Sequence, residues 1–401
     1  MRRKIVFFAE SVTLAHIARP FTLASGLDPA EFEVTFAWHP RYRNLFPVFP
    51  FTERKIQSIE SAEFLKTLDT GGPSYDVKTL IKYVEEDLVV LDEVRPDIVV
   101  GDFRLSLSVS ARLRKIPYVN ITNAYWSPYA DIRIPAPDLW PFRALPTAVA
   151  QGLFDLIRPL AFARNAGPMR ALHRHFGLRP PPPDVRAAYT LADFVAYADV
   201  SDLVPVRGLP GSHKFIGPIL WAPRVSKPDW WAEVSARPGL KAYVTLGSSG
   251  ASVILPKVIA ALSETSFTRL IATAGHRVPP TVGSKNIFYA DYLPGDEAAA
   301  ASSIVICNGG SPSSYQALSQ GTPILGLCTN FDQQLNMTTV ASRGAGISVI
   351  RSDCTADKIS NRVHRILDGS GFKSQAEKCK TELAAFPPAP KNFVHWLSDI
   401  L

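Results

Sequence analysis

In this chain, the residues best suited to chemistry lie just beyond the carboxyl end of a short apolar run. The run Ile304–Cys307 leads into two glycines, several serines and a helix-like stretch. Glycines let an anion approach the backbone, and serines at a helix start offer hydroxyl and N–H groups at the positive end of the helix dipole. The pattern predicts a diphosphate-binding turn, and a simple helix cap is the alternative. The residues expected to bind the diphosphate are Asn308, Gly309, Gly310, Ser311, Ser313 and Ser314.

Two further loops carry polar residues after an apolar run. Asp332 and Gln333 follow the run 323–327, and an acid beside an amide can bind the hydroxyls of a sugar. The alternative is that Asp332 caps the following helix. Ser248 follows the run 242–246 within a small-residue stretch that favours binding of the same diphosphate. This stretch lacks the lysine and spacing of a Walker motif, which disfavours nucleoside-triphosphate hydrolysis.

A second candidate pair lies in the first half of the chain. His16 opens a helix-like segment after the apolar run 4–9, and Asp102 follows the run 96–101. The carboxyl ends of parallel strands lie at one edge of a sheet, so we expect the two side chains to meet. An aspartate can orient an imidazole and stabilise its protonated form, which makes His16 a candidate general base. The alternatives are a structural histidine and an aspartate that caps the next helix.

Apolar runs of strand length alternate with helix-length segments, which predicts an α/β fold of two doubly wound, Rossmann-like domains with parallel sheets. The first series of strands is expected at residues 4–9, 33–38, 97–101, 118–122 and 214–217. The second is expected at residues 242–246, 269–273, 287–289, 304–307, 323–327 and 347–350. Open sheets of this kind bind ligands beyond the carboxyl ends of their strands, so we expect the domains to face each other across a cleft.

The domain boundaries follow from the two series. We predict an N-terminal domain over residues 1–218, with the proline-rich and aromatic stretch 123–213 as an insertion in it. Residues 219–240 contain several prolines and no clean period, which is typical of a linker. A C-terminal domain follows over residues 241–385.

The composition of the 401 residues is that of a globular protein. Hydrophobic residues make up 46% and charged residues 20%, values that exclude a disordered, collagenous or coiled-coil chain. The four cysteines form no C-x-x-C pair, so we expect neither a disulfide scaffold nor a metal cluster. The first apolar run ends at Glu10, too early for a signal peptide, and no apolar stretch is long enough to span a membrane. These features predict a cytoplasmic protein.

Four motifs together resemble the donor-binding signature of family 1 glycosyltransferases, the UDP-glycosyltransferase-like enzymes of the bacterial antibiotic and macrolide type. The motifs are residues 308–313, residues 321–323, Asp332-Gln333 and Asn336. Asn308 stands where the family has a phosphate-binding histidine, and an amide can donate a hydrogen bond but brings no positive charge. His16 aligns with the family's catalytic base, although Ala15 replaces the glycine that precedes it in the family.

The resemblance implies a GT-B fold and an inverting, metal-independent transferase. The co-substrate would be a UDP- or dTDP-sugar, with no other cofactor, and the sequence contains no D-x-D triplet. His16 and Asp102 would be catalytic, and backbone groups near Tyr292 and Leu293 would hold the nucleobase. The resemblance assigns acceptor binding to the N-terminal domain and nucleotide-sugar binding to the C-terminal domain. It also leads us to expect residues 386–401 to pack back towards the N-terminal domain.

The acceptor is predicted only by class. Tyr125, Trp126 and Trp140 suggest a pocket for an apolar small molecule or lipid, and they could equally be core residues. Residues 141–180 contain six arginines and one acid, which favours an anionic acceptor or contact with the inner surface of an anionic membrane, with a solvated face as the alternative. The pI of about 9.2 comes with no nucleic-acid-binding motif, so no nucleic-acid partner is expected. The alternative function is a non-catalytic auxiliary protein that binds a partner enzyme.

Overall fold

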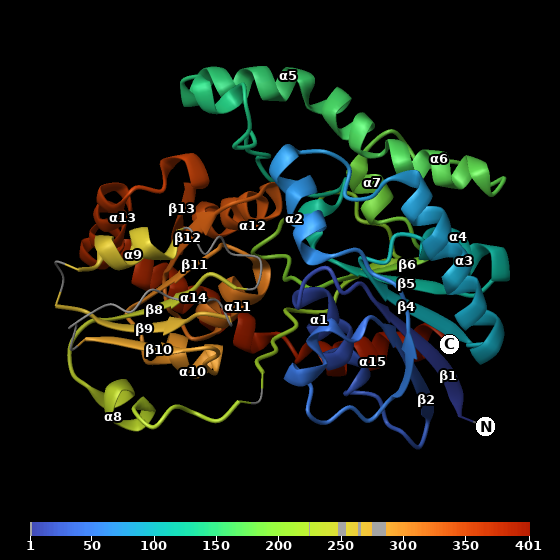
Figure 1. The fold of residues 1–401 in the computed structure, drawn as a ribbon, viewed down its shortest axis with the longest axis horizontal. Helices are drawn as coiled ribbons and strands as arrows, with labels where there is room; N and C mark the ends of the chain where they lie inside the picture. The colour runs from blue at the N-terminus through green and yellow to red at the C-terminus, as the bar shows by residue number, and fades with distance from the viewer. Residues whose placement is uncertain (1, 224, 248–253, 264–265, 275–285) are drawn as a thin grey trace. The chain divides into compact units, whose positions relative to one another are not determined.

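The computed structural model describes residues 2–223, 225–247, 254–263, 266–274 and 286–401 (Figure 1). The chain divides into two compact units. The first holds Met1–Ile132, Leu145–Trp221 and Pro387–Leu401, and the second holds Arg133–Ala144 and Ala222–Phe386. Each unit contains one fully parallel sheet, which confirms the predicted fold class.

The sheet of the first unit has seven strands in the order β3-β2-β1-β4-β5-β6-β7. The chain order reverses at β1, which pairs with β2 on one side and with β4 on the other. The two sides of this reversal form the switch point at which open α/β sheets bind ligands. The strands are β1 (Arg3–Ala9), β2 (Phe32–Trp38), β3 (Thr52–Lys55), β4 (Ile98–Asp102), β5 (Tyr118–Thr122), β6 (Phe194–Tyr197) and β7 (His213–Phe215).

Helices cover both faces of this first sheet. Val6 and Phe8 of β1 pack into an apolar cluster with Leu91 of α3 and Leu107 of α4. Phe7 points to the other face, where its ring centroid lies 6.3 Å from that of Phe393 in α15. The helices of the unit are α1 (Ala15–Ala24), α2 (Ser61–Thr70), α3 (Val77–Val94), α4 (Leu107–Arg114), α5 (Thr147–Asn165), α6 (Gly167–His175), α7 (Val185–Tyr189) and α15 (Ala389–Ile400).

The sheet of the second unit has six strands in the order β10-β9-β8-β11-β12-β13, with its switch point between β8 and β11. Its apolar core includes Val244, Ile306 and Leu325 from the strands and Val258 and Val363 from α9 and α13. The strands are β8 (Lys241–Thr245), β9 (Thr268–Ala272), β10 (Ile287–Ala290), β11 (Ile304–Cys307), β12 (Ile324–Cys328) and β13 (Gly346–Ile350). The helices are α8 (Trp231–Ala236), α9 (Leu255–Ala261), α10 (Gly295–Ala300), α11 (Ser311–Ser319), α12 (Phe331–Ser342), α13 (Ala356–Asp368) and α14 (Ser370–Ala385).

All eleven predicted strands are present, and two strands were missed. Strand β3 has the sequence TERK and a mostly exposed pattern, so it carries no apolar signal. Strand β6 lies inside the stretch 123–213 that we interpreted as an insertion, and it pairs with β5 as a regular member of the sheet. Helix α8 lies within the range expected to be a linker, and its neighbour Trp230 packs against Phe288 of β10 at a centroid distance of 5.3 Å.

Among the helices of the described residues, none is both long enough and apolar enough to cross a bilayer.

A buried histidine predicts how the stability of the protein depends on pH. His173 of α6 is fully buried, and its Nε2 lies 3.2 Å from Ser108 Oγ in α4. Burial lowers the pKa of His173 to about 4, whereas an unfolded histidine titrates near 6.5. The unfolded chain therefore binds a proton first as the pH falls. We expect the free energy of unfolding to drop by about 2–3 kcal/mol from this group between pH 7 and pH 4.5.

Urea unfolding of wild type and His173→Gln at both pH values tests this expectation. The variant carries no titrating imidazole at this position. The drop in its free energy of unfolding between the two pH values should therefore be smaller than that of wild type by about 2–3 kcal/mol. His175→Gln, which changes the exposed histidine of the same helix, is the control and should behave as wild type. Equal pH dependence in wild type and His173→Gln would contradict the assignment.

Candidate active site

His16 and Asp102 meet at the switch point of the first sheet. Asp102 is the last residue of β4 and pairs in register with Ala9, the last residue of β1. Helix α1 starts six residues later, which brings His16 back over the same strand ends. His16 Nδ1 lies 2.8 Å from Asp102 Oδ1. A carboxylate only accepts hydrogen bonds, so Nδ1 donates in the tautomer that pairs with Asp102, and Nε2 is then the ring nitrogen left to take up a proton. Arg19 Nη2 lies 3.1 Å from the same Nδ1.

The two side chains differ in exposure. The imidazole of His16 is 18% exposed, whereas the carboxylate of Asp102 is fully buried. Helix α4 starts after Ser106, so Asp102 does not cap the following helix. A partly exposed imidazole held by a buried carboxylate is the arrangement that general-base chemistry requires.

Arg19 is a third member of this group that sequence analysis missed. It lies one turn after His16 on α1 and is only 8% exposed. Its Nε donates to Asp102 Oδ2 at 2.7 Å and its Nη2 donates to Asp102 Oδ1 at 2.6 Å. Its Nη1 donates to Asn123 Oδ1 at 2.7 Å. This two-pronged contact orients the carboxylate and neutralises its charge. The available signal was an arginine three residues after His16 among apolar helix residues.

Phe103 packs against one face of the His16 imidazole. The two rings stack with centroids 4.6 Å apart and planes 11° apart. Phe103 holds a left-handed backbone conformation with φ of 58°, which is costly for a residue with a side chain and is common at functional sites. Its ring also contacts Phe64 and Tyr189, each at 5.6 Å between centroids. Tyr189 in turn lies 5.2 Å from Trp126.

The structure separates the three predicted acceptor residues. Trp126 is partly exposed and belongs to the aromatic group that surrounds His16 through Tyr189. Tyr125 is only 2% exposed and is a core residue, which was the alternative left open by the sequence. Trp140 is 80% exposed and falls in the second unit.

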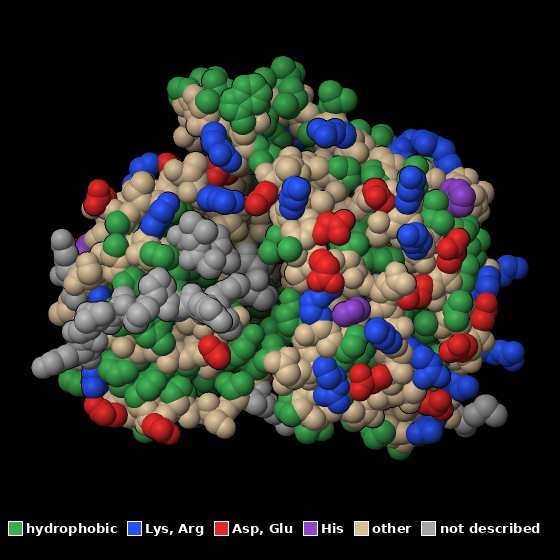
Figure 2. Space-filling view, viewed as in Figure 1, with side chains coloured by type: hydrophobic (Ala, Val, Ile, Leu, Met, Phe, Trp, Pro, Cys, Tyr) green, Lys and Arg blue, Asp and Glu red, His purple; other side chains and the backbone are tan. Residues whose placement is uncertain are grey.

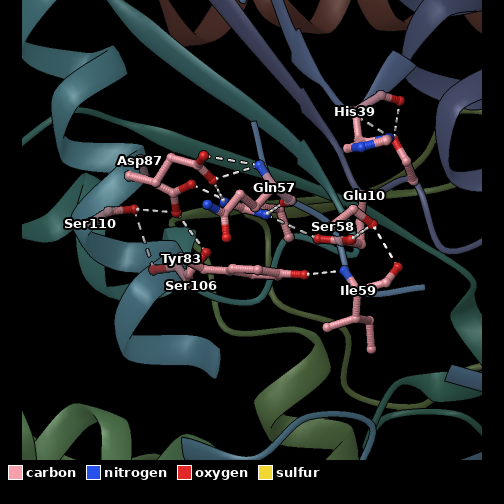
Figure 3. Close-up of polar contacts among 12 residues, drawn as sticks. Glu10, His39, Gln57, Ser58, Ile59, Tyr83, Asp87, Ser106 and Ser110 are labelled. Atoms are coloured by element: carbon pink, nitrogen blue, oxygen red, sulfur yellow. Dashed lines mark hydrogen bonds and ion pairs between the residues drawn. The ribbon is translucent and has the colours of Figure 1, made fainter. Parts of the chain in front are cut away.

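A buried ionic cluster supports the loop that carries Phe103 (Figure 3). Arg104 is fully buried and forms ion pairs with Glu10 at 3.2 Å, with Asp87 at 2.9 Å and with Glu86 at 2.9 Å. Its guanidinium lies 3.7 Å from the ring centroid of Tyr83. Residues that follow β1 and β4 are thereby tied to helix α3. This arrangement holds the backbone on both sides of the His16–Asp102 pair.

The pKa values of the acids in this cluster are shifted by their surroundings. Burial raises the pKa of Glu10 and of Asp87, and the charge of Arg104 opposes that rise. Ser58 donates to Glu10, and Ser106 donates to Asp87 at 2.6 Å, as Figure 3 shows. The hydroxyl donors and Arg104 together offset part of the loss of water around the two carboxylates.

The predicted diphosphate turn lies at the switch point of the second sheet. Asn308 follows β11 directly, and its Oδ1 accepts a hydrogen bond from the backbone N–H of Gly310 at 3.0 Å. Gly247, after β8, has φ of 65°, and a Cβ there would lie 3.1 Å from Asn308 Nδ2. The loops after β8 and β11 are therefore in close contact through Asn308. Ser248 lies outside the described residues.

The serines of the turn have different surroundings. Ser314 is 1% exposed, and its hydroxyl accepts a hydrogen bond from Asn336 Nδ2 at 2.9 Å. Asn336 Nδ2 also donates to the carbonyl of Gly309 at 2.8 Å, so these residues brace the turn from inside. Ser311 is 7% exposed and Ser313 is partly exposed, both in the first turn of α11.

The packing around Gly309 leaves no room for a side chain. Its φ is 78°, and a Cβ would lie 2.6 Å from the side chain of Met337 and 2.9 Å from Cys328 Sγ. Gly310 is the N-cap residue of α11. The backbone N–H groups of the first turn of this helix are available to face an anion, and diphosphate binding by this turn stays a prediction.

The remaining predicted donor residues lie on two loops of the same unit. Asn330, not Asp332, caps α12 by accepting from the backbone N–H of Gln333 at 3.1 Å. Gln333 is 2% exposed, and its Oε1 accepts from Thr329 N at 2.7 Å, so this oxygen serves the loop itself. Asp332 is partly exposed in the first turn of α12. Tyr292 is partly exposed and Leu293 is buried, both between β10 and α10.

Two curated relatives align with nearly the whole chain. The PGL/p-HBAD biosynthesis rhamnosyltransferase of Mycobacterium bovis (strain BCG / Pasteur 1173P2) is 44% identical over 378 residues, 94% of this chain and 83% of the relative. The PGL/p-HBAD biosynthesis glycosyltransferase of Mycobacterium tuberculosis (strain ATCC 25177 / H37Ra) is 43% identical over 394 residues, 96% of this chain and 91% of the relative. The chain belongs to the family 1 glycosyltransferases. Residues 263–400 also match the erythromycin biosynthesis protein CIII-like C-terminal domain.

Solved structures of other glycosyltransferases have the same fold. The spinosyn rhamnosyltransferase SpnG complexed with thymidine diphosphate superposes with a TM-score of 0.68 at 19% identity, covering 99% of this chain and 100% of that one. The glycosyltransferase of kitacinnamycin superposes with a TM-score of 0.69 at 17% identity, covering 98% of both chains. The fold of the family 1 chain described here is therefore GT-B.

Another relative shows that membership of the family does not by itself establish activity. An inactive PGL/p-HBAD biosynthesis glycosyltransferase of Mycobacterium bovis (strain BCG / Pasteur 1173P2) is 45% identical over 282 residues, 69% of this chain and 75% of the relative. The activity of this family 1 chain must therefore be argued from its own site residues.

The Arg104 cluster predicts a large stability difference between two arginine variants. Arg104→Met leaves Glu10 and Asp87 buried without their cation, so the free energy of unfolding should fall by about 3–5 kcal/mol. Arg114→Met removes an exposed ion pair with Asp92 and should change stability little. Urea unfolding of the two variants at pH 7 measures both values. Equal, small losses would show that the cluster does not hold the loops in place.

Proposed function

We propose that this chain is an inverting glycosyltransferase that moves a sugar from a UDP- or dTDP-sugar to a hydroxyl of an apolar small-molecule or lipid acceptor. The observation that carries the proposal is the 2.8 Å contact between His16 Nδ1 and the buried Asp102 carboxylate at the switch point of the first sheet. This pair provides a base at a site where open α/β sheets bind ligands. The proposal assigns the acceptor to the first unit and the donor to the second.

The proposed reaction is a single displacement. His16 Nε2 takes the proton of the acceptor hydroxyl as that oxygen attacks the anomeric carbon of the donor sugar. The new C–O bond forms on the face opposite the diphosphate, the bond to the diphosphate oxygen breaks, and the configuration inverts. Asp102 stabilises the imidazolium that results, while Arg19 keeps both carboxylate oxygens in place.

The proposed stabilisation of the leaving group uses fixed dipoles. Negative charge develops on the departing diphosphate, and the N–H groups and hydroxyls at the start of α11 would receive it without a metal ion. Ser313 is the partly exposed serine of this turn. Asn308 already accepts a hydrogen bond from Gly310, so only its Nδ2 would donate to the phosphate.

Two observations bear on the substrates. The relatives include a protein named as a rhamnosyltransferase and a structure with bound thymidine diphosphate, which support a dTDP-linked deoxyhexose as donor. The partly exposed rings of Phe103, Tyr189 and Trp126 beside His16 support an acceptor with an apolar, ring-bearing portion. Asp332, partly exposed at the start of α12, is the side chain that we propose for the donor sugar's hydroxyls.

Calorimetric titration with UDP and with dTDP tests the donor site. We expect micromolar binding, tighter for dTDP, and the same affinity in the presence of a chelator. Ser313→Ala should weaken binding about tenfold or more because it removes a hydrogen bond to a charged group. Ser319→Ala is the matched control, since Ser319 ends the same helix and donates to Gln316 O at 2.9 Å.

Two results would count against the proposal. Unchanged affinity in Ser313→Ala would leave this loop with a structural role only. No binding of either nucleotide by the wild-type protein would favour a non-catalytic auxiliary protein, an alternative motivated by Asn308 in the position of the family's histidine and by the inactive relative.

A further inference from the structure

Helix α5 carries a stripe of exposed apolar side chains, here called the α5 stripe. It consists of Val149, Leu153, Leu156, Ile157 and Leu160, with exposed fractions of 54%, 37%, 78%, 37% and 75%. The spacing of four, three, one and three residues places them on one side of the helix. Figure 2 shows hydrophobic side chains gathered over α5.

The fold does not need this stripe for its own packing. Helix α5 is already held by a different side, on which Ala150, Phe154 and Phe162 are buried. The guanidinium of Arg186 in α7 lies 5.4 Å from the ring centroid of Phe162. An additional apolar surface on a helix anchored in this way is typical of a docking site.

The charge around the stripe indicates what would cover it. Residues 141–180 contain six arginines and the single acid Asp155, which is paired with Arg158 at 2.8 Å. Arg164 follows the stripe on the same side of α5, and Arg174 and Arg179 are exposed in and after α6. Figure 2 shows basic side chains beside the apolar ones along α5 and α6. Leucine-rich helices with adjacent arginines bind in the plane of anionic membrane surfaces.

We propose that the α5 stripe docks the protein on a bilayer that contains anionic phospholipid. The apolar side chains enter the boundary between headgroups and acyl chains, and Arg164, Arg174 and Arg179 contact the lipid phosphates. The helix lies in the interface, since it does not qualify as a membrane span. This docking does not depend on the transferase activity, and it would give that activity access to an acceptor dissolved in the membrane.

Vesicle flotation with the full chain tests the proposal. The probes are phosphatidylcholine vesicles with and without about one quarter phosphatidylglycerol. We expect binding to the anionic vesicles, and a loss of tenfold or more in Leu156→Ser/Leu160→Ser because two exposed leucines no longer enter the bilayer. The triple variant Arg164→Gln/Arg174→Gln/Arg179→Gln should bind anionic vesicles more weakly by a similar factor. Its binding to vesicles without anionic lipid should equal that of wild type.

The control is Val48→Ser/Leu220→Ser, which removes two exposed apolar side chains elsewhere in the first unit. It should bind vesicles as wild type does, and all variants should keep the wild-type melting temperature. Failure of the wild type to bind anionic vesicles, or equal loss in the control, would overturn the proposal. A dimer that dissociates in Leu156→Ser/Leu160→Ser, without vesicle binding, would assign the stripe to a second copy of this chain.

Discussion

The arrangement of the site in the first unit depends on how the protein stabilises the buried carboxylate of Asp102 at the end of β4. Asp102 has no exposed surface, so its charge must be met by donors from the protein. Helix α1 supplies them, since Arg19 binds both oxygens and His16 binds one. The need to neutralise one buried charge thus fixes the start and the rotation of α1 over the strand ends. The same contacts engage Nδ1 of His16 and leave Nε2 as the ring nitrogen that we propose takes up the proton.

The buried ion pairs of Arg104 give the site a second support. Arg104 follows the strained Phe103 and is held by Glu10 and Asp87, so the chain between β4 and α4 has little freedom. The stacked ring of Phe103 restricts the imidazole from one side, while Asp102 restricts it from the edge. General-base catalysis depends on such restriction, because an oriented imidazole needs no reorganisation before it takes a proton.

Much of this arrangement could be predicted, and the rest depends on tertiary packing. The contact between His16 and Asp102 follows from the parallel sheet, because Asp102 ends β4 and His16 lies at the start of the helix that follows the neighbouring strand β1. Arg19 and Arg104 could not be predicted, since long basic side chains are usually exposed and only the folded chain shows their buried acids. Likewise, the inward orientation of Ser314 and Gln333 depends on Asn336 and Thr329, which local sequence patterns do not relate to them. Strand β3 was missed because an exposed edge strand has no apolar alternation.

The His16→Ala variant gives the most direct test of whether His16 is the base of a sugar transfer. Turnover and the affinity for the donor nucleotide should be measured together, with the acceptor that supports the fastest wild-type reaction. If His16 is the base, the rate of the chemical step should fall about 10²–10⁴-fold, with nucleotide affinity nearly unchanged because the donor is assigned to the other unit. Turnover equal to that of wild type would contradict the account and remove His16 from the mechanism.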